Sequence, residues 1–441
     1  MKFTKHLIAA ATTAALLAPM TASATNGYFS SGYGAASQGV AGASTALPQD
    51  SYAAAVNPAG MAHVGNRVDL GLTIFNPDRT ASVGAGTARS EMNGFIIPSG
   101  GYVRDLNDKM TAGITIYANG GMNTSYDPAD TGGFNLYGFP DRLGVDLAQL
   151  IFAPTIAYKI NKDHSVGASL LIGYQQFKAY GLQPFCGFKS DGSCPSGLGD
   201  PATGSAAANA GLTNQGYDSA WGTGIRVGWQ GKISDNITMG AAYSSKIYMD
   251  KFDDYDQLFA EQGDFDIPAN WSVGIAAKIT PKTTMTVDIQ KIEYSDVKAI
   301  ANDGPVATGA NPFPGNPADS LLGTDGGFGF GWDDMTILKM GFVYEHNSNF
   351  TYRFGLSYGD QPIGSEQSLF NVLAPAVNET HATAGFTWRP QGKDDQQITF
   401  TYMHAFDNDI DYSGYEFFGG TTPVEIGMFQ HSFEFGYSWK F

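Results

Sequence analysis

The final stretch of the chain, residues 431–441, alternates strictly between aromatic and small or polar side chains. Apart from His431, one parity holds only the aromatic residues Phe433, Phe435, Tyr437, Trp439 and Phe441. Successive side chains of a β-strand point to opposite faces, so this strand has one aromatic and one polar face. A soluble sandwich could bury the aromatic face. A strand that ends a chain on an aromatic residue is, however, typical of the closing strand of a transmembrane β-barrel.

The opposite end of the chain has the pattern of a secretory signal peptide. Lys2 and Lys5 precede an apolar run over 7–20, and small residues at 22–24 follow at the spacing of a cleavage site. The run is shorter than the roughly 20 apolar residues of a membrane-spanning helix, which disfavours a membrane anchor. We therefore expect residues 1–24 to be cleaved off after export. Because only helices and closed barrels satisfy their backbone groups in lipid, a membrane-spanning mature chain would have to be a barrel.

The composition fits short strands joined by glycine-rich turns. Glycine supplies 56 of 441 residues, aromatic residues make up 13 % and charged residues only 15 %. The net charge of −17 argues against nucleic-acid binding, which needs basic patches. Cys186 and Cys194 lie close together in an exported chain, which predicts a loop disulfide. A metal site would need more histidine or cysteine nearby, so we expect no metal and no cofactor.

Fourteen segments have the alternation of strands, and the connections between them differ in length. The predicted strands are 67–77, 93–104, 109–121, 146–160, 164–179, 217–232, 237–250, 265–279, 282–296, 333–346, 350–360, 379–390, 396–407 and 428–441. Every second connection is a short turn, and most of the others are long loops, at 122–145, 180–216, 297–332, 361–378 and 408–427. Outer-membrane barrels have short turns in the periplasm and long loops outside. We predict an all-β protein of the bacterial outer membrane, a 14-stranded antiparallel transmembrane β-barrel over 67–441.

Residues 25–66 precede the first predicted strand and are rich in glycine and alanine. Asp50 is their single acidic residue, and they contain no lysine or arginine, the next basic residue being Arg67. Such a segment is too apolar for a solvated tail. A 14-stranded barrel has a lumen too wide for its own side chains to fill. We therefore predict that 25–66 folds into the lumen as a plug, or hatch.

Two stretches of this plug carry a resemblance to a known family. They are Gly-Val-Ala-Gly-Ala at 39–43 and Ala-Ala-Ala-Val-Asn-Pro-Ala-Gly-Met at 53–61. With them, the chain resembles the FadL/TodX (OMPP1) family of outer-membrane transporters for hydrophobic compounds over essentially the whole mature chain. The tripeptide Asn-Pro-Ala alone could be a simple turn; its place in an alanine- and glycine-rich plug makes it specific. The resemblance implies uptake without an energy source, by extracellular capture, hatch movement and lateral release through a kink in the third strand.

The same resemblance assigns roles to residues of the plug. Asn57, Pro58 and Ala59 would anchor the hatch against the barrel and the ligand site. Tyr28 and Phe29 belong to the mobile N-terminus that would reach the bound ligand. These five residues are the predicted ligand-binding residues of the plug.

The kink in the third strand is expected at Asn119, Gly120 and Gly121. Paired glycines weaken strand pairing and permit a bend, which would make these residues a lateral gate. The alternative is that the two glycines simply begin the loop that follows. Both interpretations are open from the sequence.

A fatty acid would also need a partner for its carboxylate. By strand parity Arg226, Lys339 and Arg353 point into the lumen, where a cation binds a carboxylate well. Barrel lumens also hold charged pairs that touch no ligand, so each assignment has a structural alternative. Apolar loop residues could form a capture groove; they include Phe134, Leu136, Tyr137, Phe139, Phe185, Phe188, Leu198, Leu258, Phe259 and Phe265.

Long-chain fatty acids are the expected substrates, and aromatic hydrocarbons taken up by the same mechanism are the alternative. A general porin would share the barrel but not the hatch, and a structural or adhesive barrel is a further alternative. We expect no enzyme and no catalytic residues, because neither a Gly-x-Ser-x-Gly elbow nor a zinc-binding spacing accompanies the scattered histidines. The expected partners are a hydrophobic small molecule and outer-membrane lipid, with the protein a monomer.

Overall fold

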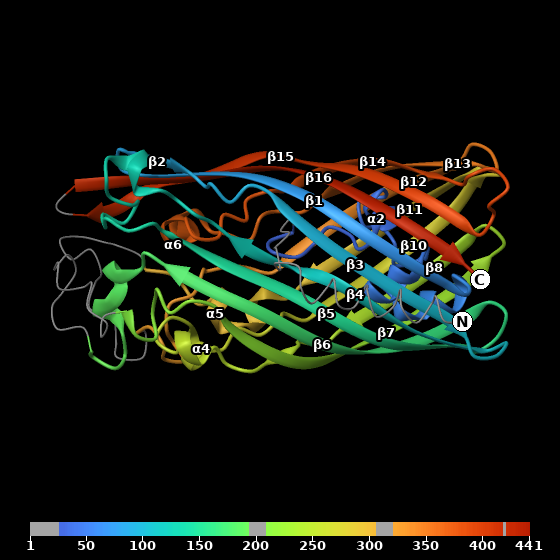
Figure 1. Ribbon diagram of the computed structural model, residues 1–441, viewed down its shortest axis with the longest axis horizontal. Helices are drawn as coiled ribbons and strands as arrows, with labels where there is room; N and C mark the ends of the chain where they lie inside the picture. The colour runs from blue at the N-terminus through green and yellow to red at the C-terminus, as the bar shows by residue number, and fades with distance from the viewer. Residues whose placement is uncertain (1–25, 194–208, 306–320, 418–419) are drawn as a thin grey trace.

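The computed structural model describes residues 26–193, 209–305, 321–417 and 420–441. The predicted signal peptide and Cys194 lie outside the described residues. Antiparallel strands form a single sheet that wraps into a long barrel (Figure 1). No helix of the described residues is long and apolar enough to cross a membrane.

In the part of the chain that the structure describes, the sheet contains 16 strands, of which two short ones, β2 (Gly86–Arg89) and β9 (Tyr248–Met249), only extend the edge of a neighbour. The other 14 form the wall: β1 (Arg67–Val83), β3 (Phe95–Asp105), β4 (Met110–Asn123), β5 (Gly144–Lys159), β6 (His164–Tyr180), β7 (Asp218–Ser234), β8 (Ile237–Ser244), β10 (Asn270–Thr280), β11 (Thr283–Ile292), β12 (Met335–Glu345), β13 (Phe350–Tyr358), β14 (Thr380–Trp388), β15 (Gln396–Phe417) and β16 (Gly420–Lys440). The last strand pairs with the first from Arg67↔Lys440 to Val83↔Val424, which closes the ring. The predicted 14-stranded antiparallel barrel is confirmed.

Side-chain parity in the closing strand β16 follows the aromatic alternation. Phe435 and Tyr437 are 45 % and 41 % exposed on the outside, whereas Ser432 and Glu434 are buried inside. Apolar side chains are exposed on the other strands as well, a pattern that a membrane-embedded barrel requires of its lipid-facing surface.

The two ends of the barrel differ. Short turns join β3 to β4, β5 to β6, β7 to β8, β10 to β11, β12 to β13 and β14 to β15, and the chain ends beside them; we call this the turn end. The opposite, loop end carries the long connections, which form most of the short helices: η3 (Pro128–Thr131), η4 (Gln183–Phe188), η6 (Asp253–Tyr255), α4 (Ala260–Gly263), η7 (Tyr294–Asp296), α5 (Lys298–Ala301), η9 (Ser365–Gln367) and α6 (Ser368–Asn371). The segregation of turns and loops by length matches the sequence prediction.

One predicted loop, 408–427, is wrong. Its described residues are instead the outer parts of β15 and β16, which stay paired from Asn408↔Met428 to Phe417↔Gly420. Ile410 and Tyr412 alternate there with exposed acidic residues. These acidic residues suggest a solvated loop. They lie instead on the outer face of the β15–β16 hairpin, which extends beyond the exposed apolar side chains of the wall. A smaller difference is that the predicted strand 237–250 divides into β8 and β9.

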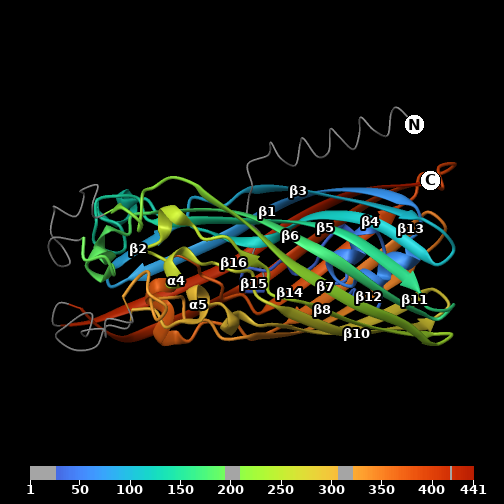
Figure 2. The same ribbon diagram turned by 90° about the horizontal axis from the view of Figure 1, so that it is seen from below.

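Residues 26–66, which precede β1, lie inside the barrel towards the turn end, as Figures 1 and 2 show. These described residues form three short helices, α2 (Ala35–Gln38), η1 (Ser51–Ala55) and η2 (Pro58–His63), and most of their side chains are buried. Short helices need side-chain caps for their first N–H groups. Asp50 accepts a hydrogen bond from Tyr52 N at the start of η1, and Asn57 accepts one from Ala59 N at the start of η2.

Candidate functional site

The wall of the barrel is interrupted between β3 and β4. The ladder between β1 and β3 continues up to Phe75↔Phe95, but the ladder between β3 and β4 ends at Gly100↔Ile116. Residues 95–99 of β3 and 117–123 of β4 are therefore not paired with each other. We call this interruption the window. It lies on the loop-end side of the ladder, and its β4 edge is bent by a bulge between Ala118 and Gly120 in the pairing with β5.

N-terminal residues 26–30, which we call the N-terminal segment, bind to β4 at the window. Phe29 forms an antiparallel bridge with Gly120, and Gly121 N donates to Tyr28 O at 3.1 Å. Ser30 N donates to the main-chain oxygen of residue 119 at 3.0 Å. Asn119, Gly120 and Gly121 lie inside β4, which ends at residue 123, and not in the loop that follows. The predicted gate residues and the predicted mobile N-terminus are thus in direct contact.

Gly120 is the closest point of this contact. A Cβ atom at this position would lie 1.6 Å from the Tyr28 carbonyl oxygen, so only glycine permits the main chains to approach. We expect Gly120→Ala to displace the N-terminal segment from β4. Alkylation of a cysteine introduced by Ser30→Cys should then become at least several-fold faster.

The matched control for this prediction is Gly100→Ala, at the β3 edge of the window. A Cβ there meets only ordinary contacts, at 3.7 Å and beyond. Equal labelling rates in Gly120→Ala and Gly100→Ala proteins would show that the N-terminal segment does not depend on this close approach.

Aromatic rings enclose the N-terminal segment. The ring centroids of Tyr28 and Tyr294 are 5.4 Å apart, and that of Trp332 lies 6.0 Å from Tyr28. The Tyr294 hydroxyl donates to Asn26 O at 2.6 Å and accepts from Tyr28 N at 3.1 Å. Phe29 packs edge-on against Tyr294 at 5.9 Å. Tyr28 and Phe29 are fully buried, so the N-terminal segment leaves the window only by breaking an aromatic cluster.

The same aromatic packing continues to the loop end. Phe265 links Tyr28 to Phe259, with centroid distances of 6.3 Å and 4.9 Å. Phe330 also contacts Trp332, and their ring centroids are 6.1 Å apart. A small cavity of ≈ 10 Å³ lies among these side chains, lined by Val145, Phe177, Leu182, Leu258, Phe259, Ala299, Phe328, Phe330, Phe370 and Leu373. An apolar path therefore connects the loop end to the N-terminal segment.

Several of these loop residues were missed by sequence reasoning. Phe328, Phe330 and Trp332 stand in the alternation Gly-Phe-Gly-Phe-Gly-Trp at 327–332, a signal that could have found them. Among the predicted groove residues, Phe185, Phe188, Leu258, Phe259 and Phe265 are buried, Phe134 is exposed, and Leu198 lies outside the described residues. Cys186 is buried in η4, and because Cys194 is not described, the loop disulfide stays a prediction.

Asn57, Pro58 and Ala59 contact the wall at β6 and β7. The Asn57 side-chain amide donates to Thr45 O at 2.8 Å within the plug and to Trp229 O at 2.9 Å on β7. A Cβ at Gly228 would lie 2.1 Å from the Asn57 side-chain oxygen, so the plug reaches the wall main chain here. Ser165 on β6 donates to Ala59 O at 3.2 Å.

Two of the predicted lumen cations hold main-chain carbonyls of the plug. Lys339 Nζ donates to Ser31 O at 2.8 Å. Arg226 Nη1 donates to Ala54 O at 3.2 Å and to the Tyr117 hydroxyl at 2.9 Å. Both side chains are buried. Both cations are therefore bonded to the plug. A ligand carboxylate would bind them only by replacing these carbonyl oxygens.

The third cation, Arg353, also reaches the plug. Its Nε donates to the Gln49 side chain at 2.7 Å, and its Nη1 donates to Thr387 at 2.7 Å. Asp50 follows Gln49 in the sequence. Burial, together with the neighbouring Asp69 carboxylate, raises the pKa of Asp50 to about 7. The plug is thus anchored by cations of the wall, and its own acidic group is shifted towards the neutral form.

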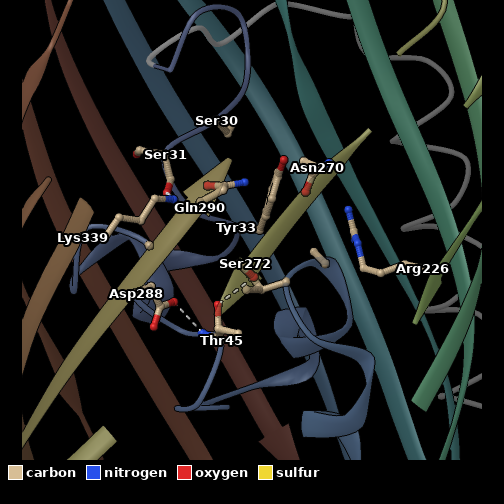
Figure 3. A pocket seen from close by; sticks show the side chains of 14 residues that line it. Ser30, Ser31, Tyr33, Thr45, Arg226, Asn270, Ser272, Asp288, Gln290 and Lys339 are labelled. Carbon is tan, nitrogen blue, oxygen red and sulfur yellow. Dashed lines mark hydrogen bonds between the residues drawn. The ribbon is translucent and has the colours of Figure 1, made fainter. Parts of the chain in front are cut away.

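A polar cavity of ≈ 20 Å³ separates Lys339 from Arg226, and Figure 3 shows the two side chains reaching it from opposite sides. It is lined by Ser30, Ser31, Gly32, Tyr33, Gly42, Thr45, Ala55, Val56, Arg226, Asn270, Ser272, Asp288, Gln290 and Lys339. Thr45 fixes this side of the plug, because its N–H donates to Asp288 at 2.8 Å and its hydroxyl to Ser272 at 2.9 Å. The cavity has room for a water molecule and not for an alkyl chain.

The chain is similar to known proteins over most of its length. The family model described as outer membrane protein transport protein (OMPP1/FadL/TodX) matches residues 11–425. The long-chain fatty acid transport protein of Escherichia coli O157:H7 is 22 % identical over 358 residues, which cover 73 % of either chain.

Solved structures share the fold at low identity. A FadL homologue of Pseudomonas aeruginosa superposes with a TM-score of 0.68 at 18 % identity, covering 94 % of this chain and 100 % of that one. The toluene transporter TodX of Pseudomonas putida also gives a TM-score of 0.68, at 20 % identity, covering 95 % and 100 %. The chain is similar to both structures to the same extent. This similarity identifies the fold, whereas the ligand has to be inferred from the residues of this chain.

Proposed function

This chain belongs to the OMPP1/FadL/TodX family of outer membrane transport proteins, and from that premise we propose that its substrates are long-chain fatty acids. Its function is the uptake of hydrophobic compounds across the outer membrane, and it is a transport channel, not an enzyme. The observation that supports a fatty acid is the set of buried lumen cations, Arg226, Lys339 and Arg353. A carboxylate binds a cation by charge-assisted hydrogen bonds, whereas an aromatic hydrocarbon offers only the weaker cation–π attraction of its ring.

Capture begins at the loop end, which faces the outside of the cell. The apolar path from the cavity beside Phe259 to Tyr28 offers the alkyl chain a continuous hydrophobic environment. Transfer of apolar surface out of water is favourable at roughly 25 cal/mol per Å². In the described arrangement the path is closed, since its cavity of ≈ 10 Å³ is too small for a chain. Loop side chains therefore have to move apart as the ligand enters.

The carboxylate then competes with the plug for the lumen cations. Lys339 donates to Ser31 O and Arg226 to Ala54 O, both of them neutral acceptors. A carboxylate carries the opposite charge that a main-chain carbonyl lacks, so it is the stronger acceptor for a buried cation. Ligand binding would therefore release the main chain of the plug beside the N-terminal segment. This competition couples ligand binding to hatch movement without an energy source.

Release is lateral, through the window between β3 and β4. The N-terminal segment occupies the β4 edge of the window, and its departure opens a route from the lumen into the membrane. Such a route keeps the alkyl chain in apolar surroundings, whereas a water-filled pore along the axis would not. Asn119, Gly120 and Gly121 form the gate in this proposal, with Tyr28 and Phe29 as the moving part.

The test is uptake of radiolabelled oleate and toluene by cells that lack their own transporters of this kind. We expect the protein to raise oleate uptake and Lys339→Met to reduce that gain roughly ten-fold, the effect of losing one hydrogen bond to a charged group. Toluene uptake should not fall in this variant. The control is Lys278→Met, which removes an exposed lysine at the turn end.

Uptake of aromatic hydrocarbons by the same mechanism is the second candidate, favoured by the ring-lined path itself. Toluene uptake without oleate uptake would establish it and would remove the carboxylate role of Lys339. Uptake of small sugars with neither hydrophobic compound would identify a general porin and contradict the proposed hatch.

A further inference from the structure

Arg79 on β1 is a buried cation at the edge of the window. Its side chain lies inside the barrel wall and is only 5 % exposed. The guanidinium donates to Asn123 O at the end of β4 and to Met92 O in the segment that leads into β3. It therefore connects the two edges of the window at its loop-end side. At the other side the window ends where β3 pairs with β4. Its position is distinct from that of the cations that hold the plug.

Within the described part of the chain Arg79 forms no direct ion pair, and the nearest carboxylate that acts on its charge, that of Asp146, does so from a distance. None of the ion pairs there includes Arg79, and its Nε atom has no hydrogen-bond partner. Arg67 on the same strand is equally buried and is paired with Asp69 at 2.7 Å. An unpaired buried charge is costly, and buried charges are normally paired. The contrast within one strand marks Arg79 as a buried cation that is available to an external anion.

The surroundings of Arg79 identify the chemistry of that anion. A cavity of ≈ 20 Å³ adjoins it, lined by Gly27, Phe75, Pro77, Arg79, Gly121, Met122, Asn123, Ala374, Pro375, Ala376, Met428 and Gln430. The Phe95 ring lies 5.8 Å from the guanidinium. One cation among phenylalanine, methionine and proline side chains fits an anionic head group attached to an apolar chain. Because Gly27 forms part of this wall, departure of the N-terminal segment would enlarge the cavity.

We propose that Arg79 is a carboxylate-binding site at the window, which holds the head group of a long-chain aliphatic carboxylate while its tail passes between β3 and β4. The site rests on the proposed fatty-acid function and adds to it a second binding position after the lumen cations. An arginine suits this position because its planar fork can hold both carboxylate oxygens. Its two present acceptors, Met92 O and Asn123 O, lie on either side of the window and are neutral, so a carboxylate can replace them.

The experiment uses the purified full-length protein in lipid nanodiscs. The probe is laurate that carries a photoreactive diazirine on the carbon next to the carboxyl group, and the matched uncharged probe is the corresponding dodecanol. After illumination, labelled peptides are mapped by mass spectrometry, and competition with unlabelled laurate gives the affinity. Arg79→Met, Arg79→Lys and the control Arg104→Met, an exposed arginine of β3, are compared.

We expect laurate to label Met92, Met122 or Met428 beside Arg79. In Arg79→Met protein this labelling should need about ten-fold more laurate, the factor for one hydrogen bond to a charged group. Arg79→Lys should retain part of it, and labelling by the dodecanol probe should not change. Equal loss of both probes would overturn the proposal, because it would mean that Arg79 only supports the cavity. Unchanged laurate labelling in Arg79→Met protein would overturn it as well.

Failure of the site and failure of the proposed function give different results. Labelling needs no transport, so Arg79-dependent labelling with no oleate uptake by cells would refute the function and keep the site. Oleate uptake together with labelling that ignores Arg79 would refute the site and keep the function. Migration of the unheated protein in gels, which reports barrel folding, confirms that each variant is folded before it is tested.

Discussion

A disulfide between the N-terminal segment and β4, made by Ser30→Cys with Asn119→Cys, is expected to abolish uptake of oleate and toluene alike. Ser30 N donates to the main-chain oxygen of residue 119 beside the Phe29↔Gly120 bridge. Residues directly opposite in such a hydrogen-bonded pair lie about 5.5 Å apart, within the range of roughly 4.4–6.8 Å that a disulfide spans. The cross-link would hold the N-terminal segment in the window. A reductant should restore uptake in the same cells.

Three controls make this result specific. Each single cysteine variant should transport after oxidation, which removes loss of the Asn119 side chain as an explanation. The unaltered protein with and without reductant accounts for Cys186 and Cys194. A cysteine pair at Ala276 and Thr286, which are opposite one another on β10 and β11, joins strands that are already paired and should leave uptake unchanged. Continued uptake by fully cross-linked protein would place the exit elsewhere than the window.

The barrel was predictable from the sequence because lipid imposes a simple rule on every strand. One face must be apolar wherever the wall meets the membrane, so alternation in segments such as 431–441 marks strands directly. The rule stops where the wall leaves the lipid. Ile410 and Tyr412 alternate with acidic residues beyond the membrane-facing part of the wall, so this acidic stretch favours a loop in the sequence although it continues the two strands.

The contacts of the plug were less accessible to sequence reasoning. Parity places Lys339, Arg226 and Arg353 in the lumen, but it cannot say which acceptor each cation meets. That depends on how residues 26–66 fold, and short helices with single side-chain caps leave little periodic signal. Arg79 has the same parity as the lumen-facing residues of β1, and only the structure reveals that it forms no direct ion pair in the described part of the chain.

Loosening the hatch at Asn57 is expected to turn a closed barrel into an ion-conducting one. Asn57→Ala removes the hydrogen bonds to Thr45 O and Trp229 O and the cap on Ala59 N. Leaving these buried groups unpaired costs about 1–3 kcal/mol each. A loss of only 2 kcal/mol raises the released population by a factor of roughly 30. In planar lipid bilayers the unaltered protein should show no resolved current steps, and Asn57→Ala should show them frequently.

Gly228→Ala tests the same contact from the wall side. Its added Cβ would lie 2.1 Å from the Asn57 side-chain oxygen, so the plug should be displaced while Asn57 itself is intact. Gly100→Ala, which adds the same methyl group to the wall without a close contact, should remain closed. If the unaltered protein already conducts as well as both variants, the barrel is an open pore and the porin alternative is correct. If neither variant conducts, Asn57 does not keep the hatch in place, and the remaining anchors, Lys339, Arg226 and Arg353, suffice to hold it without the Asn-Pro-Ala contact.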